Sequence, residues 1–207
     1  MTDDPDLDRA YALKTPEDSV RLYRDWADTY DRDFAQASDY VLPAEVSRHY
    51  AVLGGFGPVL DVGAGTGLCG AALAGRGIGP VDGTDISAEM LETARTKGIY
   101  RHLFTGNILT GLDAPDTYQG AVSSGTFTNG HVGPDGLDAM LAAVRPRGWI
   151  VVSVNAQHYA ATGFAAKLAA LGDAISDLSE TEVAIYGPGA TGPHAGDTAL
   201  LIAFRRA

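Results

Sequence analysis

Short apolar runs alternate with stretches of helical periodicity along residues 58–207. The runs Val59–Val62 (apart from its aspartate) and Trp149–Val154 (apart from its serine) are apolar, as expected of strands covered on both faces of a sheet. From Leu137 to Val144, apolar residues recur at intervals of three and four positions, which indicates a helix. Strands that alternate with helices favour a mostly parallel sheet with helices on both faces. The pattern therefore predicts an α/β fold.

Five further strands complete a predicted sheet of seven. No helical pattern separates the last two runs, so we expect them to form an antiparallel hairpin at one edge. A loop of glycine, proline, threonine and alanine joins these two strands. The five predicted strands are Val81–Ile86, His102–Thr105, Gly120–Ser124, Val183–Tyr186 and Ala199–Phe204.

The first 57 residues have a different, helical character. Thr15–Asp18 combines a capping residue, a proline and two acids, the composition of a helix start. Val20–Phe34 then repeats apolar and aromatic residues, Trp26 among them, at helical spacing, and a second helix is expected from Pro43 to Leu53. We interpret residues 1–57 as a helical lid and 58–207 as the core of a single domain.

A glycine cluster follows the first strand of the core, in Asp61-Val62-Gly63-Ala64-Gly65-Thr66-Gly67. A strand that enters such a loop and leaves it as a helix lets a ligand lie against bare backbone. The dinucleotide fingerprint Gly-x-Gly-x-x-Gly fails when counted from Gly63, because its third position is Leu68, but it matches from Gly65 to Gly70. The glycines alone therefore leave open which nucleotide cofactor binds.

Two acids flank this cluster and favour S-adenosylmethionine over NAD. Asp85 ends the second strand, where a carboxylate can accept both ribose hydroxyls of an adenosine, a group that the two cofactors share. Asp61 precedes the glycines, where it can attract the positive methionine ammonium but gains nothing from a second phosphate. The other interpretation of Asp61 is that it caps backbone N–H groups of the loop.

The sequence resembles the class I S-adenosylmethionine-dependent methyltransferases over about residues 20–155, with an implied Rossmann-like fold. The resemblance rests on four motifs in order: Val59–Gly67, Val81–Leu91, Gly106-Asn107 and Arg145–Trp149. Within the class, the stretches Trp26…Tyr30-Asp31 and Gly125–Val132 are similar to methyltransferase-like proteins of the Williams–Beuren region.

This resemblance implies roles at the methionine end of the cofactor. Gly63, Gly65 and Gly67 would line the methionine moiety, and Asp61 would face its amino group. The resemblance places Ser124 beside the same moiety. The helix that carries Tyr30 would fold over the cofactor as a lid.

At the adenosine end, the resemblance assigns the ribose to Asp85 and one face of the adenine to Ile86. Asn107 stands where the class usually has an aspartate that reads the adenine amino group, and its carbonyl oxygen can still accept that hydrogen bond. The remaining residues expected at the cofactor are Ala64, Thr66, Met90 and Ile108.

One histidine is a candidate for catalysis. His131 follows the fourth strand, where substrates meet the methyl group in this fold class, and an imidazole there can accept a proton from a hydroxyl or amine. The alternative is a structural hydrogen bond within the loop.

His194 lies in the Gly187–Gly196 loop, which has the composition of a mobile flap. Cys69 is expected to be a small buried hydrophobe, and Asp82 an ordinary polar residue at a strand start.

Charge and composition narrow the classes of partner. The net charge is −11, from 15 basic and 26 acidic side chains, and the acids are densest before residue 40. Such a chain is repelled by nucleic acid and by anionic membranes. One cysteine excludes an internal disulfide and a cysteine-rich zinc site. The acidic start and the lack of a 20-residue apolar run favour a cytoplasmic protein without a membrane span.

The sequence therefore predicts a methyltransferase that uses S-adenosylmethionine, no metal, and an O, N or S nucleophile of a small molecule or a protein side chain. Two alternatives stay open. One is a module that binds S-adenosylmethionine or S-adenosylhomocysteine without catalysis. The other is an NAD-dependent dehydrogenase.

Overall fold

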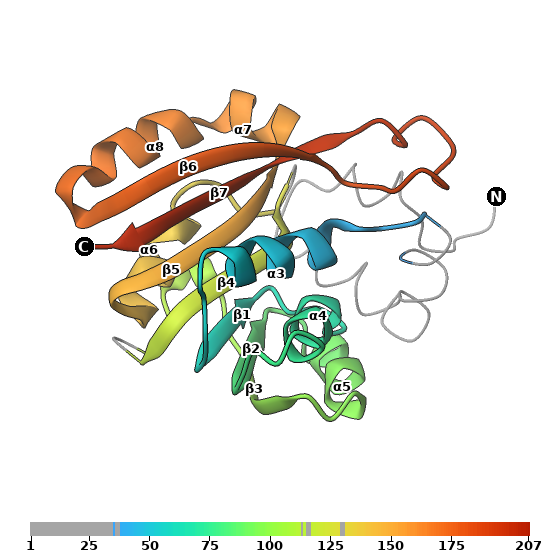
Figure 1. Ribbon diagram of the computed structural model, residues 1–207, viewed down its shortest axis with the longest axis horizontal. Coiled ribbons are helices and arrows are strands. Elements are labelled where there is room, and N and C mark those ends of the chain that lie inside the picture. The colour runs from blue at the N-terminus through green and yellow to red at the C-terminus, as the bar shows by residue number, and fades with distance from the viewer. Residues whose placement is uncertain (1–34, 36–37, 113, 115–116, 129–130) are drawn as a thin grey trace.

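The computed structural model describes residues 35, 38–112, 114, 117–128 and 131–207. Within this part of the chain, seven strands form one sheet in the order β3-β2-β1-β4-β5-β7-β6 (Figure 1). β1 to β5 pair in parallel, whereas β7 is antiparallel to both β5 and β6. The predicted parallel sheet with an antiparallel hairpin at one edge is confirmed. The strands are β1 (Val59–Val62), β2 (Val81–Asp85), β3 (Tyr100–Thr105), β4 (Tyr118–Phe127), β5 (Val144–Asn155), β6 (Ile175–Ala184) and β7 (Thr198–Arg206).

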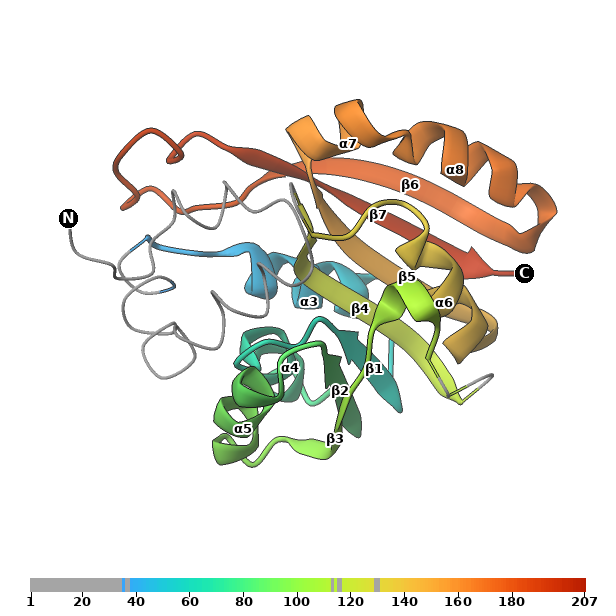
Figure 2. The ribbon, with the colours of Figure 1, turned by 180° about the vertical axis from the view of Figure 1, so that it is seen from behind.

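Helices cover both faces of the sheet. α3 and α4 lie on the face turned toward the viewer in Figure 1, and Figure 2 shows α6 on the opposite face. The α-helices are α3 (Leu42–Val52), α4 (Leu68–Ala74), α5 (Ala88–Thr96), α6 (Gly136–Ala143), α7 (Ala156–Thr162) and α8 (Phe164–Leu171), with 3₁₀ helices η2 (Ile108–Thr110) and η3 (Gly172–Ala174). No helix among the described residues is long and apolar enough to cross a membrane.

The core has two halves, one on each face of the sheet. Successive side chains of a strand point to opposite faces, so Val59 packs with Val46 and Tyr50 of α3, whereas Leu60 packs with Met140 of α6. All five side chains are fully buried. This packing on both faces fixes the ends of the central strands, which carry the site.

The strand order reverses between β1 and β4. The chain runs outward from β1 through β2 to β3 and then returns to β4, on the other side of β1. Loops at the carboxyl ends of β1 and β4 therefore leave in opposite directions, and a crevice opens between them.

The predicted strands are correct in number but not in length. β6 begins at Ile175, eight residues before the predicted start at Val183, because it is an exposed edge strand of mainly polar residues with no apolar alternation. β6 also ends at Ala184, and Tyr186 instead forms an isolated bridge to Tyr40. β5 begins at Val144, directly after α6, so the Arg145-Pro146 pair lies inside a strand.

Asp82 corrects another expectation. It is buried, with only 3% of its surface exposed, and is not an ordinary polar residue at a strand start. Its carboxylate accepts two hydrogen bonds from Arg101, at 2.9 and 2.7 Å, and one from the Tyr118 hydroxyl at 3.1 Å. These bonds join the amino ends of β2, β3 and β4, where Arg101 lowers the pKa of Asp82 against the opposing effect of burial.

The last part of the predicted lid belongs to the core. α3 occupies most of the predicted range Pro43–Leu53 and packs on α4 and β4, with Val46 and Tyr50 fully buried. The predicted aromatic helix, including Trp26 and Tyr30, lies outside the described residues. The lid and the contact of Tyr30 with the cofactor therefore stay predictions.

Candidate cofactor-binding site

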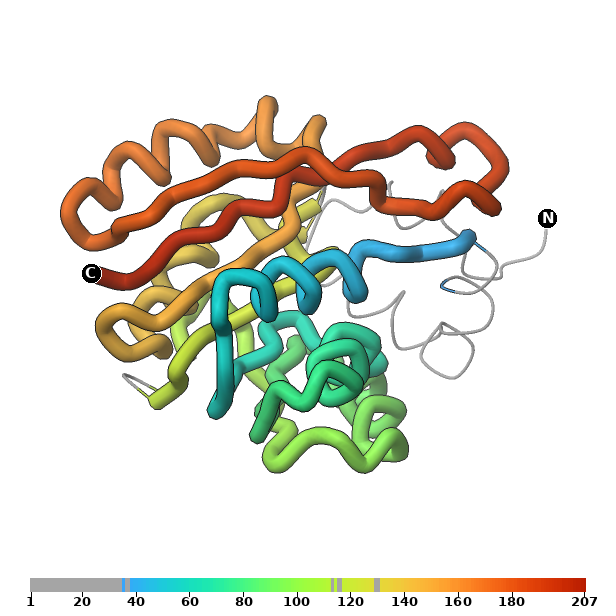
Figure 3. The backbone as a smooth tube through the Cα atoms, in the orientation of Figure 1, coloured from blue at the N-terminus to red at the C-terminus, as the bar shows by residue number. Residues whose placement is uncertain are grey.

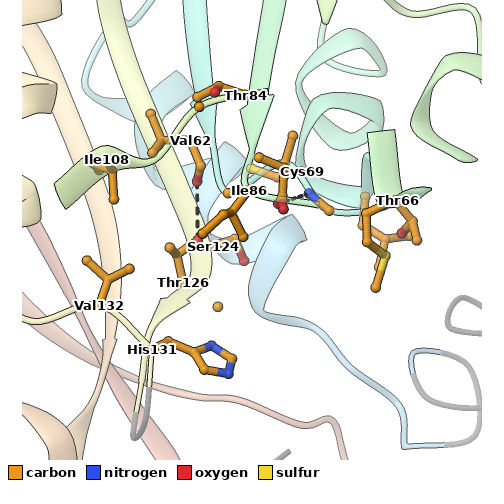
Figure 4. A pocket seen from close by; sticks show the side chains of 18 of the residues that line it. Val62, Thr66, Cys69, Thr84, Ile86, Ile108, Ser124, Thr126, His131 and Val132 are labelled. Atoms are coloured by element: carbon orange, nitrogen blue, oxygen red, sulfur yellow. Dashed lines mark hydrogen bonds between the residues drawn. The ribbon is translucent and has the colours of Figure 1, made fainter. Parts of the chain in front are cut away.

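A cavity of about 160 Å³ lies at the carboxyl ends of β1, β2 and β4 (Figure 4). It is comparable in size to a cavity of about 150 Å³ that admits benzene in another protein. The predicted site residues that line it are Gly63, Ala64, Gly65, Thr66, Asp85, Ile86, Met90, Asn107, Ile108, Ser124 and His131.

The glycine loop needs its glycines for two different reasons. Gly63, Gly65 and Gly67 all have positive φ (+68°, +53° and +93°), which side chains with a β-carbon rarely adopt. A β-carbon at Gly63 would also collide with the Thr126 side chain, whereas one at Gly65 would meet no atom within 4 Å. Gly65 therefore borders open space within the cavity, where a ligand can approach the backbone.

Asp85 connects this loop to the next helix. Its Oδ2 accepts the N–H of Gly65 at 2.8 Å, and its Oδ1 accepts the N–H of Ser87 at 2.9 Å. Ser87 caps α5 by accepting the N–H of Met90. Burial raises the pKa of Asp85, against the effect of these backbone donors. Each carboxylate oxygen has a second lone pair, so the group can still accept hydrogen bonds from a ligand.

Asp61 lies behind the cavity wall and not among the residues that line it. Its side chain is fully buried, Oδ2 accepts the Tyr100 hydroxyl at 2.7 Å, and Oδ1 has no hydrogen-bond partner. Burial raises the pKa of Asp61 to about 6, opposed mainly by the bond from Tyr100. The contact of Asp61 with a ligand amino group stays a prediction. Among the predicted site residues that the structure describes, Gly67 is the other one outside the lining, and it lies against the Tyr100 ring.

Asn107 already uses the acceptor that was assigned to the adenine. Its Oδ1 accepts the N–H of Leu109 at 2.9 Å and thereby caps η2. The side chain still lines the cavity beside Ile108. The amide oxygen has a second lone pair, so its position is compatible with the predicted role.

Two hydroxyls at the cavity have no protein partner. Ser124 Oγ and Thr84 Oγ1 are both buried without a hydrogen bond, and both residues line the cavity. Burying a hydroxyl without a partner costs about 1–3 kcal/mol, so such atoms commonly accommodate a water or a ligand. Nearby, Thr126 donates to the carbonyl of Val62 at 3.2 Å (Figure 4). Ser123 donates to the same carbonyl at 2.8 Å, and both bonds join β4 to β1.

His131 reaches the cavity from the loop after β4 (Figure 4). Burial and, to a smaller extent, the charge of neighbouring His158 together lower its pKa to about 4. His158 is itself buried, and its Nε2 lies 2.9 Å from the carbonyl oxygen of Val132. The predicted catalytic histidine is therefore neutral at physiological pH.

Sequence reasoning missed half of the cavity lining. Leu68 and Cys69 follow the glycine loop, so their proximity to it was a usable signal. Cys69 is buried as expected, with its pKa raised by burial, but it also lines the cavity. Most of the other missed residues lie within or directly beside the stretches that carry the resemblance, but no role was assigned to them: Val62, Thr84, Gly106, Leu109, Gly125, Thr126 and Val132. Tyr40 and Pro43 come from a distant segment without a motif.

His194 lies outside this lining. Its Nδ1 is 3.0 Å from Asp197 Oδ2 within the loop between β6 and β7. Among the described residues, no group of three or more His, Cys, Asp or Glu side chains is placed to hold a metal ion.

Comparison with known proteins points to one kind of domain. Residues 59–148 match the family model of a methyltransferase domain. This range contains the glycine loop, Asp85, Asn107, Ser124 and His131. No protein with a curated description matches the chain in sequence.

Solved structures share the fold at low sequence identity. One is a 1,6-didemethyltoxoflavin-N1-methyltransferase from Burkholderia thailandensis with S-adenosylhomocysteine bound (19% identity, TM-score 0.58, 94% of this chain and 92% of that chain). A TehB-like S-adenosylmethionine-dependent methyltransferase from Corynebacterium glutamicum is 18% identical (TM-score 0.61, 90% and 99%).

A possible histamine N-methyltransferase from Thermotoga maritima is 13% identical (TM-score 0.62, 91% and 99%). At these identities the likeness concerns the fold. The chain therefore has the Rossmann-like fold of the class I methyltransferases, with residues 59–148 matching a methyltransferase domain.

Proposed function

We propose that this protein transfers the methyl group of S-adenosylmethionine to an O, N or S nucleophile of a small molecule. The observation that carries the proposal is the order of polar groups across one continuous cavity. Asn107 follows β3, Asp85 ends β2, the glycine loop follows β1, and Ser124 lies on β4. An extended ligand with an adenosine at one end and an amino acid at the other fits this order.

The residues present fit that cofactor. Asp85 offers free lone pairs for ribose hydroxyls, and the open space at Gly65 admits a group next to the backbone. Ser124 Oγ and Thr84 Oγ1 are buried hydroxyls that lack partners. The 1,6-didemethyltoxoflavin-N1-methyltransferase of similar fold has S-adenosylhomocysteine bound in its structure. This bound molecule supports the assignment.

When bound, S-adenosylmethionine supplies a methyl group that is already electrophilic. The protein then needs to hold a nucleophile in line with that methyl and to exclude water, so positioning accounts for much of the rate. This requirement agrees with a cavity that is lined largely by uncharged side chains. The proposal includes no metal. Asp85 and the glycine loop bind the cofactor and orient it.

We assign His131 the task of orienting the acceptor. A base with a pKa of about 4 is neutral at pH 7 but takes up a proton only weakly. A neutral imidazole is, however, a good acceptor for an O–H or N–H of the substrate. His131→Ala is expected to leave S-adenosylhomocysteine affinity within twofold of wild type and to slow methyl transfer. Loss of cofactor affinity in this variant, measured by calorimetry, would contradict the placement.

The narrower resemblance, to the methyltransferase-like proteins of the Williams–Beuren region, is part of the proposal and names no acceptor. A protein side chain is the second class of acceptor. The alternatives are a non-catalytic module that binds the cofactor and an NAD-dependent dehydrogenase.

We further propose that the protein acts in the cytoplasm without nucleic acid or membrane partners, because its net charge of −11 repels other polyanions.

Transfer of a labelled methyl group separates the enzyme from the module. Purified full-length protein is incubated with S-adenosylmethionine labelled in the methyl group and with a cell extract divided into small-molecule and protein fractions. We expect label in the small-molecule fraction, and none with Gly65→Ala, which should not bind the cofactor. Tight cofactor binding with no label in either fraction would favour the module.

A further inference from the structure

The loop between β6 and β7 is fastened to the segment that leads into α3. The carbonyl of Asp39 accepts the N–H of Gly187 at 2.7 Å, and its carboxylate accepts the N–H of Gly189 at 3.0 Å. Two residues further along the chain, Val41 donates its N–H to the carbonyl of Ile185 at 3.1 Å. Figure 3 shows these two segments, far apart in sequence, running side by side. We call the contact of Asp39 with Gly187 and Gly189 the latch.

The latch fits closely and includes an unusual backbone conformation. Asp39 has a φ of +50°, which is rare outside glycine and is best tolerated by Asn and Asp. Gly187 has no room for a side chain, because a β-carbon there would collide with the Asp39 carboxylate. The residues on both sides of the latch are therefore matched to each other.

Tyr40 connects the latch to the cavity. It bridges to Tyr186, and the two rings lie 6.0 Å apart. Its hydroxyl oxygen is 2.6 Å from where a β-carbon of Gly125 would be, so it lies directly over the backbone after Ser124. Tyr40 also lines the cavity. This is the β4 side, opposite the end of the cavity formed by Asp85 and Asn107.

We propose that Tyr40 closes the reacting end of the cavity and that the latch positions it there. Asp39 is thus a positioning residue that acts through Tyr40, and the loop between β6 and β7 contributes to the site without lining it. The inference rests on the proposed function, because that function defines the β4 side as the reacting end.

A double-mutant cycle on the full-length protein tests this, with S-adenosylhomocysteine as the probe in calorimetry. We expect Asp39→Ala to weaken binding about 3- to 10-fold, since the displaced Tyr40 opens the cavity to water. Tyr40→Ala should weaken it at least as much. Combining the two should cost no more than Tyr40→Ala alone, because Asp39 acts only through Tyr40.

Three further variants serve as controls. Asp39→Asn retains an acceptor oxygen and a residue type suited to positive φ, so it should bind within twofold of wild type. Asp177 lies in β6, on the hairpin whose loop carries the latch glycines, and has a φ of +54°. Asp177→Ala therefore matches the backbone strain of Asp39→Ala and should bind like wild type. Gly187→Ala disrupts the latch from its other side and should reproduce the loss seen in Asp39→Ala.

The possible failures are distinguishable. If wild type binds no S-adenosylhomocysteine, the proposed function is wrong and this inference falls with it. If wild type binds but Asp39→Ala or Tyr40→Ala binds equally well, only the inference is overturned. Fully additive losses in the double variant would also overturn it, because they would mean that Asp39 does not act through Tyr40.

Discussion

Asp85 combines a structural role with the proposed binding role. Its carboxylate holds the glycine loop through Gly65 and the start of α5 through Ser87, and it lines the cavity. We expect Asp85→Ala to weaken S-adenosylmethionine binding by about 1–3 kcal/mol, the usual scale for hydrogen bonds to a charged group. Calorimetry measures this. As a control, Glu92→Ala, at an exposed site on α5, should bind like wild type. Unchanged affinity in a folded Asp85→Ala variant would refute the assignment of Asp85 to the ribose.

Asp61 should make stability depend on pH. Its pKa is raised from 3.8 to about 6 by burial, so the folded state holds the proton more tightly than the unfolded state. The free energy of unfolding therefore falls as pH rises from about 4 to about 6, by roughly 3 kcal/mol. Asp61→Asn cannot titrate, so its stability relative to wild type should rise over this range. Urea unfolding at pH 4.5 and 7.5 checks the sign, and parallel pH profiles for both proteins would contradict it.

Single residues also mark the limit of sequence reasoning. The pattern around Asp85 and Ser87 is local, because a strand end, a cap and a helix start lie within a few positions. The partner of Asp61 is Tyr100, 39 residues away, and no spacing rule connects the two. The same holds for Tyr40, which lies outside every motif and reaches the cavity only through the tertiary fold.

At the scale of elements, the glycine loop allows a matched test. Gly65 and Gly77 both have positive φ, and a β-carbon at either would meet no atom within 4 Å. Alanine should therefore cost each site a similar amount of stability, about 1–2 kcal/mol. Gly65 lines the cavity and Gly77 does not.

We therefore predict that Gly65→Ala abolishes or strongly weakens S-adenosylhomocysteine binding, whereas Gly77→Ala binds like wild type. Thermal unfolding of both variants serves as the control for stability. Equal binding by the two variants would show that the ligand does not approach the backbone at Gly65.

The elements themselves were predictable where burial imposes a pattern. β1 and β5 have apolar runs because helices cover both of their faces, and α5 has a recognisable cap. Most of β6 was not predicted from the sequence, because nearly all of its residues are exposed. An edge strand without a buried face has no need for alternating apolar residues.

At the scale of the molecule, the fold brings together groups from four strand ends and from two distant segments. The parallel core of the sheet and its antiparallel edge could be expected from the alternation of elements. The position of Tyr40 on the β4 side of the cavity could not be predicted from the sequence. It depends on a contact between residues 39–41 and the loop after β6.

One titration tests the central claim, that this cavity binds S-adenosylmethionine. Full-length protein is titrated by calorimetry with S-adenosylhomocysteine, the stable product of the cofactor, and separately with NAD⁺. The account predicts saturable one-to-one binding of S-adenosylhomocysteine, lost in Gly65→Ala, and no measurable binding of NAD⁺. Binding of NAD⁺ without S-adenosylhomocysteine would contradict it.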